Sequence, residues 1–587
     1  MKENKLLASV ALFKELYDSN KDIYDVIGEL LKAAIVFENK WAFNATEAKQ
    51  MLESTFDFNI PEAVVKTTLK NRLKNRDNIL IFSGGLFTLV SEEIKKSKPL
   101  SLELEATKKI QNEIIDVLIS YISSKSNKII DDHEKENIVN NFSSYLLDNS
   151  VSKKYSSDIS AYIIQRKSEI GFTKSLNAVR EGFVLYNGVR YTPDLSELGT
   201  WKHKLTIYLD TEYLFNAVGY SGDLHKQLFD DFYGLVREIN QGKNKFIELK
   251  YFEECREEIN GIFHVAERII EGKVTLDPSR TVMQYILTGS KTKSDIISSK
   301  ANLYSKLNSM RITMETRKDF YSEIKYNIEG ESLISDLKEE AQENGWRINE
   351  DKLHAALKMF SKINILRQGV NSGAFEKIGH ILVSGKSLTS HLAFNSLIKP
   401  VNEDIPFSTD LDFITNRFWF KMNKGLTNHN SLPRSLDVVA KAQVVLSSQI
   451  DSSISEKFDL LKSDLSIGKI TKKDAEYLNN ELRKNIIAPE NLTQERLEET
   501  LSYLSHNSFE DHLREKSILE KKAKDGEVAI KKIEDMQESR NQLQLKRRIL
   551  KAKTLVTFLA ILIIFFTLSF YALFAYLIYP KRFKFRC

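Results

Sequence analysis

The N-terminal part of the chain alternates apolar runs at helical spacing with one pair of β-rich runs. Residues 22–34 predict a helix that buries one face, formed by Ile23, Val26, Ile27, Leu30, Leu31 and Ala34. A short helix is predicted over 44–53, and a third over 60–76, where Pro61 suits the first turn. Residues 79–90 place two β-rich runs on either side of Ser-Gly-Gly, which predicts a hairpin.

The predicted third helix carries an apolar stripe beside a basic one. Val65, Leu69 and Leu73 recur every four residues and are expected to be buried. The basic side chains near them are Lys66, Lys70, Arg72, Lys74 and Arg76. Three helices and a hairpin of these lengths resemble a winged helix-turn-helix domain, here over 1–95. Such a helix suits contact with the phosphate backbone of nucleic acid. A winged helix that binds protein, with its lysines solvated, explains the same pattern.

The middle of the chain changes from helical patterns to alternating strands and helices. Residues 96–195 predict a helical connector that ends in a short extended element over 184–192. Residues 196–430 predict an α/β domain with helical insertions. Its first strand, Leu205–Leu209, ends at Asp210 and passes at once into a helix. Because ligands bind beyond the carboxyl ends of parallel strands, Asp210 is a candidate site residue.

Further segments of the α/β region follow the same alternation. A second strand is predicted over 246–252, and the helix after it opens with several glutamates. Helices are predicted across 280–368, and 380–387 predicts a strand that ends in a turn. Residues 404–420 contain two aspartates beside a short apolar run.

Residues 204–420 resemble a PIN-like nuclease domain, in which acidic residues near strand ends converge on Mg²⁺ or Mn²⁺. The resemblance implies Asp210 as the first acid, and Glu254 or Glu257 as the second, with Glu253 and Glu258 as alternatives. The remaining acids that the resemblance implies are Asp351, Asp410 and Asp412, and the metal ligands would be Asp210, Glu254, Asp351 and Asp410. Carboxylates suit this role because hard divalent cations prefer oxygen ligands and activate water for phosphodiester cleavage.

The chain departs from the PIN-like pattern at the later strand. Family members end that strand in Thr-x-Asp, whereas this chain has Val-Ser-Gly-Lys-Ser over 383–387, so a lysine, Lys386, lies near the place of the expected carboxylate. Asp410 or Asp412 would have to replace it, and otherwise the domain would be a scaffold. Asp210 also suits an N-cap, which is compatible with a ligand role. The glutamates at 253–258 also suit a helix N-terminus.

The C-terminal part of the chain predicts a stalk and a membrane anchor. Residues 431–553 predict a helical stalk, and its part over 500–550 is rich in Glu and Lys and suits self-association. Residues 554–580 predict a transmembrane helix, since the 25 residues from Leu555 to Tyr579 carry no charge. A basic tail, 581–587, follows the predicted span.

Charge is distributed unevenly along the 587 residues. The chain has 85 Lys and Arg against 80 Asp and Glu, a net charge of +5. Ten basic residues and no acidic residue lie between Arg540 and Cys587, which leaves −5 for residues 1–539. Nucleic-acid binding therefore needs a local basic patch. The start of the sequence lacks the apolar core of a secretory signal, and together with the C-terminal span this predicts a single-pass membrane protein with a cytoplasmic body.

These patterns predict a multidomain, mostly α protein with a central α/β (PIN- or Rossmann-like) domain, an N-terminal winged helix and one C-terminal transmembrane helix. The function that they favour is a membrane-anchored nuclease acting on RNA or DNA with Mg²⁺ or Mn²⁺. Its architecture resembles that of bacterial defence or stress-response proteins. Two alternatives are a non-catalytic membrane-tethered DNA-binding regulator or scaffold, and an effector that permeabilises the membrane.

Overall fold

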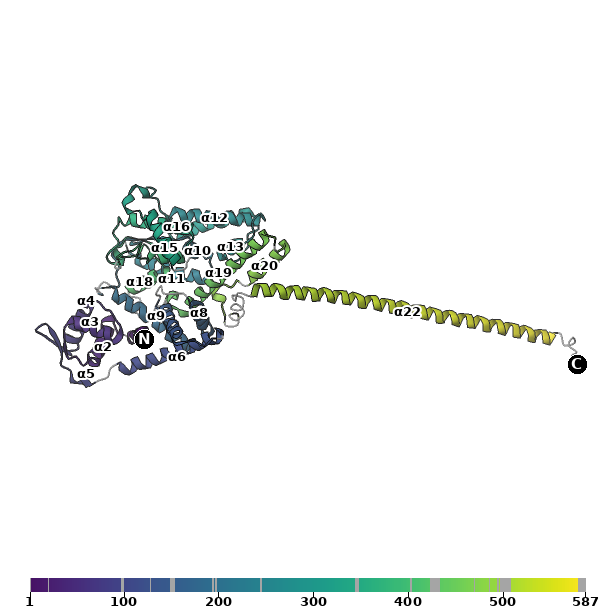
Figure 1. Cartoon of the computed structure of the whole chain (residues 1–587), viewed down its shortest axis with the longest axis horizontal. Helices are drawn as coiled ribbons and strands as arrows, with labels where there is room; N and C mark the ends of the chain where they lie inside the picture. The colour runs from purple at the N-terminus through teal and green to yellow at the C-terminus, as the bar shows by residue number, and fades with distance from the viewer. Residues whose placement is uncertain are drawn as a thin grey trace. The chain divides into compact units, whose positions relative to one another are not determined.

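The computed structural model shows a mostly helical chain with one parallel sheet (Figure 1). It describes residues 2–578 except 20, 97–99, 127, 148–153, 193–194, 196–197, 243–244, 344–347, 402–403, 423–432, 469, 485, 494–495 and 497–507. Contacts divide the chain into two compact units, Met1–Leu501 and Ser502–Cys587. The predicted boundaries near residues 95, 195 and 430 therefore fall inside the first unit.

The predicted N-terminal elements are present in the structure. They are α2 (Ile23–Phe37), α3 (Ala45–Phe56), α4 (Glu62–Thr68) with its π-helical continuation η1 (Leu69–Lys74), β1 (Ala42–Phe43), β2 (Leu80–Ser83) and β3 (Leu86–Leu89). The strands form an antiparallel sheet in the order β1-β3-β2. The predicted hairpin is confirmed, and both of its turn glycines, Gly84 and Gly85, have the positive φ that a tight turn between strands requires.

A further N-terminal helix, α1 (Lys2–Asp18), was not predicted from the sequence. It packs along α9 (Ile170–Arg190), and Lys14 forms a 2.8 Å ion pair with Glu181 across the two helices. The helices between the hairpin and α9 along the chain are α5 (Glu92–Lys96), α6 (Ser101–Ser126), α7 (Asp132–Leu146) and α8 (Ser156–Gln165). The predicted connector is thus helical, and α1 belongs to the same helical layer.

The prediction of an extended element over 184–192 was wrong. Residues 184–190 belong to α9, and its buried face includes Leu185, Tyr186 and Val189. Gly188 lies so close to the Phe420 ring that a Cβ there would come within 2.4 Å of it. The β-branched and aromatic residues of this segment favour a strand, but packing against a distant helix outweighs that local preference.

Within the described residues, five strands form one parallel sheet in the order β6-β5-β4-β7-β8. The predicted strands at 205–209, 246–252 and the start of 380–387 are confirmed. The bounds are β4 (Leu205–Leu209), β5 (Ile247–Tyr251), β6 (Ile312–Met314), β7 (His380–Val383) and β8 (Ser408–Thr409). The sequence patterns did not reveal β6, which lies inside the range predicted to be helical, and did not define β8 as a strand.

Helices connect the parallel strands on both faces of the sheet. The chain moves outward from β4 to β6, then returns past β4 to β7, and right-handed crossovers change face at such a reversal. The helices before the reversal are α10 (Thr211–Val218), α11 (Asp223–Ile239), α12 (Glu253–Ile270), α13 (Thr281–Leu287) and α14 (Lys293–Ser309). Those after it are α15 (Glu331–Glu343), α16 (Glu350–Leu366), α17 (Ser387–Ala393) and α18 (Leu411–Lys421).

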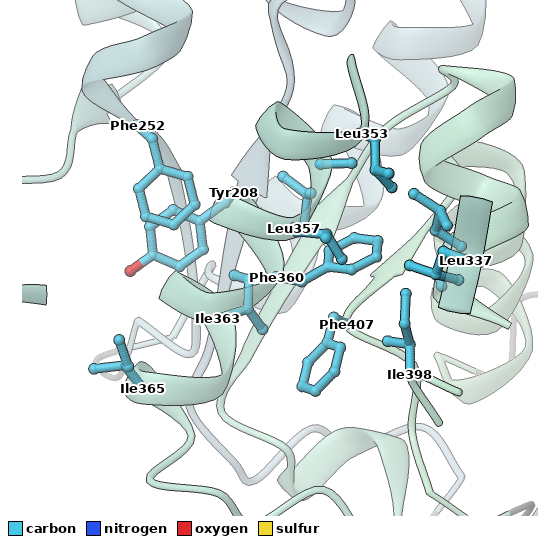
Figure 2. Close-up of a cluster of buried hydrophobic side chains, with 14 of the residues drawn as sticks. Tyr208, Phe252, Leu337, Leu353, Leu357, Phe360, Ile363, Ile365, Ile398 and Phe407 are labelled. Carbon is cyan, nitrogen blue, oxygen red and sulfur yellow. The ribbon is translucent and has the colours of Figure 1, made fainter. Parts of the chain in front are cut away.

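A large apolar cluster joins the sheet to α16 (Figure 2). The rings of Tyr208 and Phe252 stack with centroids 4.3 Å apart, and Phe360 of α16 lies 5.8 Å from Phe407. These side chains and their neighbours are buried. The cluster fixes the strands on which the candidate site is built, because close-packed interiors resist displacement of single elements.

The region predicted as a stalk is divided between the two units. In the first unit, α19 (Val438–Ser466) packs against α8, and α20 (Lys472–Lys484) packs against α19. The second unit contains α22 (Ser508–Ile578), which is long and apolar enough to cross a membrane, judged by length and composition alone. The described part of the predicted span, 554–578, belongs to α22, while the basic tail lies outside the described residues.

Candidate functional site

The candidate site lies where the order of the parallel sheet reverses. The central strand β4 pairs with β5 on one side and β7 on the other, and each side is reached by a separate crossover. Such a switch point opens a crevice beyond the carboxyl ends of the two strands. Asp210 follows β4 and Ser384 follows β7, so both lie at this carboxyl edge. The prediction that Asp210 ends the first strand is confirmed.

Asp210 is buried, and both of its carboxylate oxygens accept hydrogen bonds. The backbone N–H of Thr211 donates to Oδ1 over 2.8 Å, which makes Asp210 the N-cap of α10. The hydroxyl of Ser384 donates to Oδ2 over 2.7 Å. Lys386 Nζ donates to Oδ1 over 3.0 Å. The capping role that was left open from the sequence is therefore real.

Lys386 joins Asp210 to a second carboxylate, that of Glu258 on α12. Its Nζ lies 3.2 Å from Glu258 Oε2, and the hydroxyl of Thr211 donates to the same oxygen over 2.7 Å. Burial lowers the pKa of Lys386, but Asp210 and Glu258 outweigh burial and hold that pKa above its usual value. Lys386 therefore keeps its positive charge at any physiological pH. Among the acids predicted for the second position, Glu258, which was given as an alternative, is the one that shares Lys386 with Asp210.

Glu212, in the first turn of α10, is the third carboxyl group near the site. The backbone N–H of Gly385 donates to its Oε1. Burial, and after it the charge of Asp210, raise the pKa of Glu212 to about 7. Glu212 can therefore exchange a proton near neutral pH. The nearby Cys255 thiol faces the Leu209 carbonyl at 3.7 Å, and burial raises its pKa to about 12, so it stays protonated.

The preferred second acid, Glu254, is held by lysines of α16 rather than by the Asp210 cluster. Lys362 Nζ lies 2.6 Å from its Oε1, and Lys358 Nζ lies 2.9 Å from the same oxygen. Burial raises the pKa of Glu254, but hydrogen bonds from these lysines outweigh burial and lower it. Glu257 is exposed on α12, and Asp351 is exposed in the first turn of α16. The structure leaves these three residues outside the Asp210 cluster.

Asp410 and Asp412 lie at the same edge of the sheet, on the far side of β7. Asp410 follows β8 and caps α18 by accepting a hydrogen bond from Phe413 N over 2.7 Å. Burial first, then Glu212, Asp410 and Asp412, raise the pKa of the buried Tyr213. Both aspartates therefore act electrostatically on the region between β4 and β8. Asp410 thus has a structural role as the N-cap of α18.

The arrangement around Asp210 does not fit a divalent metal ion. Mg²⁺ and Mn²⁺ need direct carboxylate oxygens at about 2.0–2.2 Å, whereas the space between Asp210 and Glu258 holds the ammonium of Lys386. Throughout the described ranges, no group of three or more His, Cys, Asp or Glu side chains is placed to hold a metal. The Mg²⁺ or Mn²⁺ expected from the resemblance therefore has no matching set of ligands here.

Four of the five predicted nucleic-acid-binding residues lie on the helix formed by α4 and η1, and Arg76 lies in the turn that follows η1. Val65, Leu69 and Leu73 are fully buried, as expected, which turns the lysine stripe outward. Lys66 and Lys70 are exposed, and no ion pair involves either side chain in the described part of the chain. Lys74 lies 5.9 Å from the centre of the Phe82 ring in the hairpin. These lysines form what we call the lysine face: Lys66, Lys70 and Lys74.

The two predicted arginines point to acidic partners instead. Arg72 forms ion pairs with Asp22 and with Asp25, the latter over 2.9 Å. Arg76 pairs with Asp25 over 2.6 Å and with Asp77 over 2.8 Å. Arg72 therefore links η1 to the start of α2, and Arg76 links the turn after η1 to the same helix. A signal for this was present in the sequence, since Asp22 and Asp25 open a helix that must pack on the third one, but spacing alone did not identify the pairs.

Other members of the Asp210 cluster were also missed from the sequence. Ser384 and Lys386 belong to a turn that is 174 and 176 residues from Asp210 along the chain. Lys386 was noticed only as a departure from a family pattern, and its ion pair depends on the register of β4 with β7. The signal that could have indicated them is the Ser-Gly-Lys-Ser sequence at 384–387, which follows an apolar run and so marks polar side chains at the end of a strand.

Comparisons of the chain with family models, with curated proteins and with solved structures found no match. The PIN-like and winged-helix resemblances therefore stay predictions, and the functional argument depends on geometry alone.

Proposed function

We propose that this protein is a membrane-tethered nucleic-acid-binding protein whose α/β centre serves as a scaffold. The observation that carries the proposal is the lysine face. Lys66 and Lys70 are exposed without an ion-pair partner in the described residues, and Lys74 continues their row. Because the body of the chain is acidic overall, this local positive surface is what would attract a polyanion.

The spacing of the lysine face suits a phosphate backbone. Lys66 lies in α4, and Lys70 and Lys74 lie in the π-helical segment η1, so successive lysines are about one helical turn apart. Duplex DNA carries one negative charge per ~1.7 Å of its axis. Each lysine can therefore reach a different phosphate. The hairpin β2–β3 contributes exposed apolar side chains beside Lys74, including Phe82 at 40% exposure. This composition supports backbone binding rather than base recognition, which needs hydrogen-bonding side chains aimed at base edges.

The membrane part of the proposal depends on α22. Its uncharged segment from Leu555 is longer than the ~20 residues that a bilayer core requires. Basic residues precede it, and these suit anionic lipid headgroups. We place the nucleic-acid-binding unit on the cytoplasmic side.

A metal-dependent nuclease is the function that the resemblance favoured, and the geometry supports it less well than a scaffold. Lys386 takes the space between Asp210 and Glu258, and Glu254 is paired with lysines of α16. Self-association through residues 500–550 and permeabilisation of the membrane stay predictions.

Binding of the full-length chain in nanodiscs to fluorescent duplexes of arbitrary sequence tests the proposal. We expect wild-type protein to bind duplex DNA or RNA in ~50 mM salt and to lose affinity steeply by ~200 mM. The variant Lys66→Ala/Lys70→Ala should bind at least about tenfold more weakly. Its log–log salt slope should fall in magnitude by about 1.8, which corresponds to two lost phosphate contacts.

Lys472→Ala/Lys473→Ala is the matched control, since it removes two exposed lysines from α20 and leaves the lysine face intact. It should bind like wild type. If wild-type protein binds no duplex at low salt, or if the lysine-face variant binds as tightly as the control, the proposal fails.

A further inference from the structure

We propose that Lys386 is the resident cation of the carboxylate cluster formed by Asp210 and Glu258. Its ammonium holds the position that a divalent ion would need, and the cluster accepts such an ion only when that ammonium is removed. This inference concerns the sheet edge, and it stands or falls independently of nucleic-acid binding by α4.

The geometry places one ammonium group between two carboxylates from different elements. Lys386 Nζ lies 3.0 Å from Asp210 Oδ1 and 3.2 Å from Glu258 Oε2. Asp210 follows β4, Glu258 lies on α12, and Lys386 follows β7, so the contact joins three separate parts of the fold. A chance contact of a surface lysine with one nearby acid would not join three elements on both sides of the switch point.

The surroundings fix this arrangement on the Asp210 side. The side chain of Asp210 is only 6% exposed, and Thr211 N and the Ser384 hydroxyl also donate hydrogen bonds to it. The backbone N–H of Lys386 lies 3.3 Å from the Ser384 hydroxyl oxygen, to which it donates. The turn that carries Lys386 is therefore hydrogen-bonded, through Ser384, to the carboxylate whose charge Lys386 neutralises.

Ammonium and divalent ion exclude one another at this position. A divalent cation binds carboxylate oxygens directly, at about 2.0–2.6 Å, and can complete its coordination shell with water. It could reach Asp210 Oδ1 and Glu258 Oε2 only by expelling Lys386, and two positive ions would repel strongly in this partly buried space. A single ammonium, in contrast, satisfies both oxygens at ordinary hydrogen-bond distances.

Removing the ammonium should expose a cation site. In Lys386→Met, Asp210 and Glu258 lose the positive charge that they share and keep only neutral hydrogen-bond donors. A buried carboxylate such as that of Asp210 is unfavourable without a counter-charge. Mn²⁺ can then bind to both. Isothermal titration calorimetry of the full-length chain should show one Mn²⁺ bound per Lys386→Met chain, at least tenfold tighter than any Mn²⁺ binding by wild type.

The double variant Lys386→Met/Asp210→Asn is the control for the location of this Mn²⁺. It should lose the acquired binding, because the second substitution replaces a charged carboxylate with a neutral amide. Failure of folded Lys386→Met to acquire Mn²⁺ binding, or survival of that binding in the double variant, would overturn the proposal.

A second measurement uses unmodified protein and needs no variant to fold. The Lys386 side chain is 45% exposed, so an amine-reactive reagent can reach it, and mass spectrometry can follow its labelling rate. Millimolar Mn²⁺ should leave the rate unchanged, with exposed Lys472 as the internal reference. An increase specific to Lys386 would mean that Mn²⁺ expels the ammonium from the wild-type cluster, and the proposal would be wrong.

Discussion

Asp451 illustrates how one partly buried carboxyl group makes stability depend on pH. It lies on α19, where burial, and after it the charge of Asp277, raise its pKa from 3.8 to about 7. Between these values the folded chain holds a proton that the unfolded chain has released. The free energy of unfolding therefore falls as pH rises from about 4 to about 7, and stays low above that range.

Asp451→Asn should remove this pH dependence. At pH 8 we expect the variant to be more stable than wild type by on the order of 2 kcal/mol, and at pH 4.5 the two should nearly coincide. Guanidinium unfolding at both pH values measures the difference. Asp459→Asn changes a side chain of the same helix that is 73% exposed, so it should change stability little at either pH. Equal effects of both variants would contradict the assignment to Asp451.

At the scale of single residues, a site residue could be predicted only where the sequence next to it carried a signal. Asp210 was identified because a short apolar strand ends at it, and the structure places it at the switch point. Lys386 was not identified as its partner, since nothing local to either residue encodes an ion pair across β4 and β7. Glu254 was preferred on position alone, and the lysines that hold it come from another helix more than a hundred residues away.

The packing of α1 on α9 depends on a glycine at the point of closest approach. A Cβ at Gly182 would lie 1.8 Å from the carbonyl oxygen of Val10, a backbone atom that cannot move without shifting α1. Gly182→Ala should therefore destabilise the chain by about 3 kcal/mol, since overpacking outweighs the higher helix propensity of alanine. Thermal unfolding measures the loss, and limited proteolysis should show earlier cleavage near α1.

Gly171→Ala is the control within the same helix. A Cβ at Gly171 meets no heavy atom within 4 Å, so alanine there should leave stability unchanged or raise it slightly. If both variants unfold alike, close packing against Val10 is not what selects glycine at position 182.

At the scale of elements, strongly periodic helices and long strands could be predicted, and short strands could not. The helices α2 and α3 and the strand β4 carry their own pattern of buried positions. By contrast β6 has three residues and β8 has two, too few for any period to show. The segment 184–190 had strand-like composition, but it is helical because Gly188 packs beneath Phe420.

At the scale of the whole chain, charge and hydropathy separate an acidic body from a basic, apolar C-terminal segment. The net charge of −5 over residues 1–539 makes non-specific attraction to nucleic acid weak, so binding depends on the lysine face. The boundary between the two compact units, near residue 501, lies within the range 431–553 that was predicted as a stalk. Nothing in local periodicity indicated that 438–466 would pack into the first unit, because its apolar stripe suits a stalk equally well.

The α22 helix provides the last prediction, which concerns attachment of the whole protein to a bilayer. Ile563 and Phe566 lie within the uncharged segment and are 61% and 68% exposed on α22. Each arginine near a bilayer centre costs about 2.5–3.5 kcal/mol of insertion free energy. Ile563→Arg/Phe566→Arg should therefore shift the full-length chain from the membrane fraction to the soluble fraction after alkaline extraction.

The matched control places the same charges elsewhere on α22. Ile530 and Ile533 are 59% and 57% exposed but precede the uncharged segment, so Ile530→Arg/Ile533→Arg should leave the chain in the membrane fraction. Because both variants add two positive charges to the same helix, a difference between them isolates insertion from electrostatic attraction to headgroups. If the Ile563/Phe566 variant stays bound as firmly as its control, α22 does not span the bilayer.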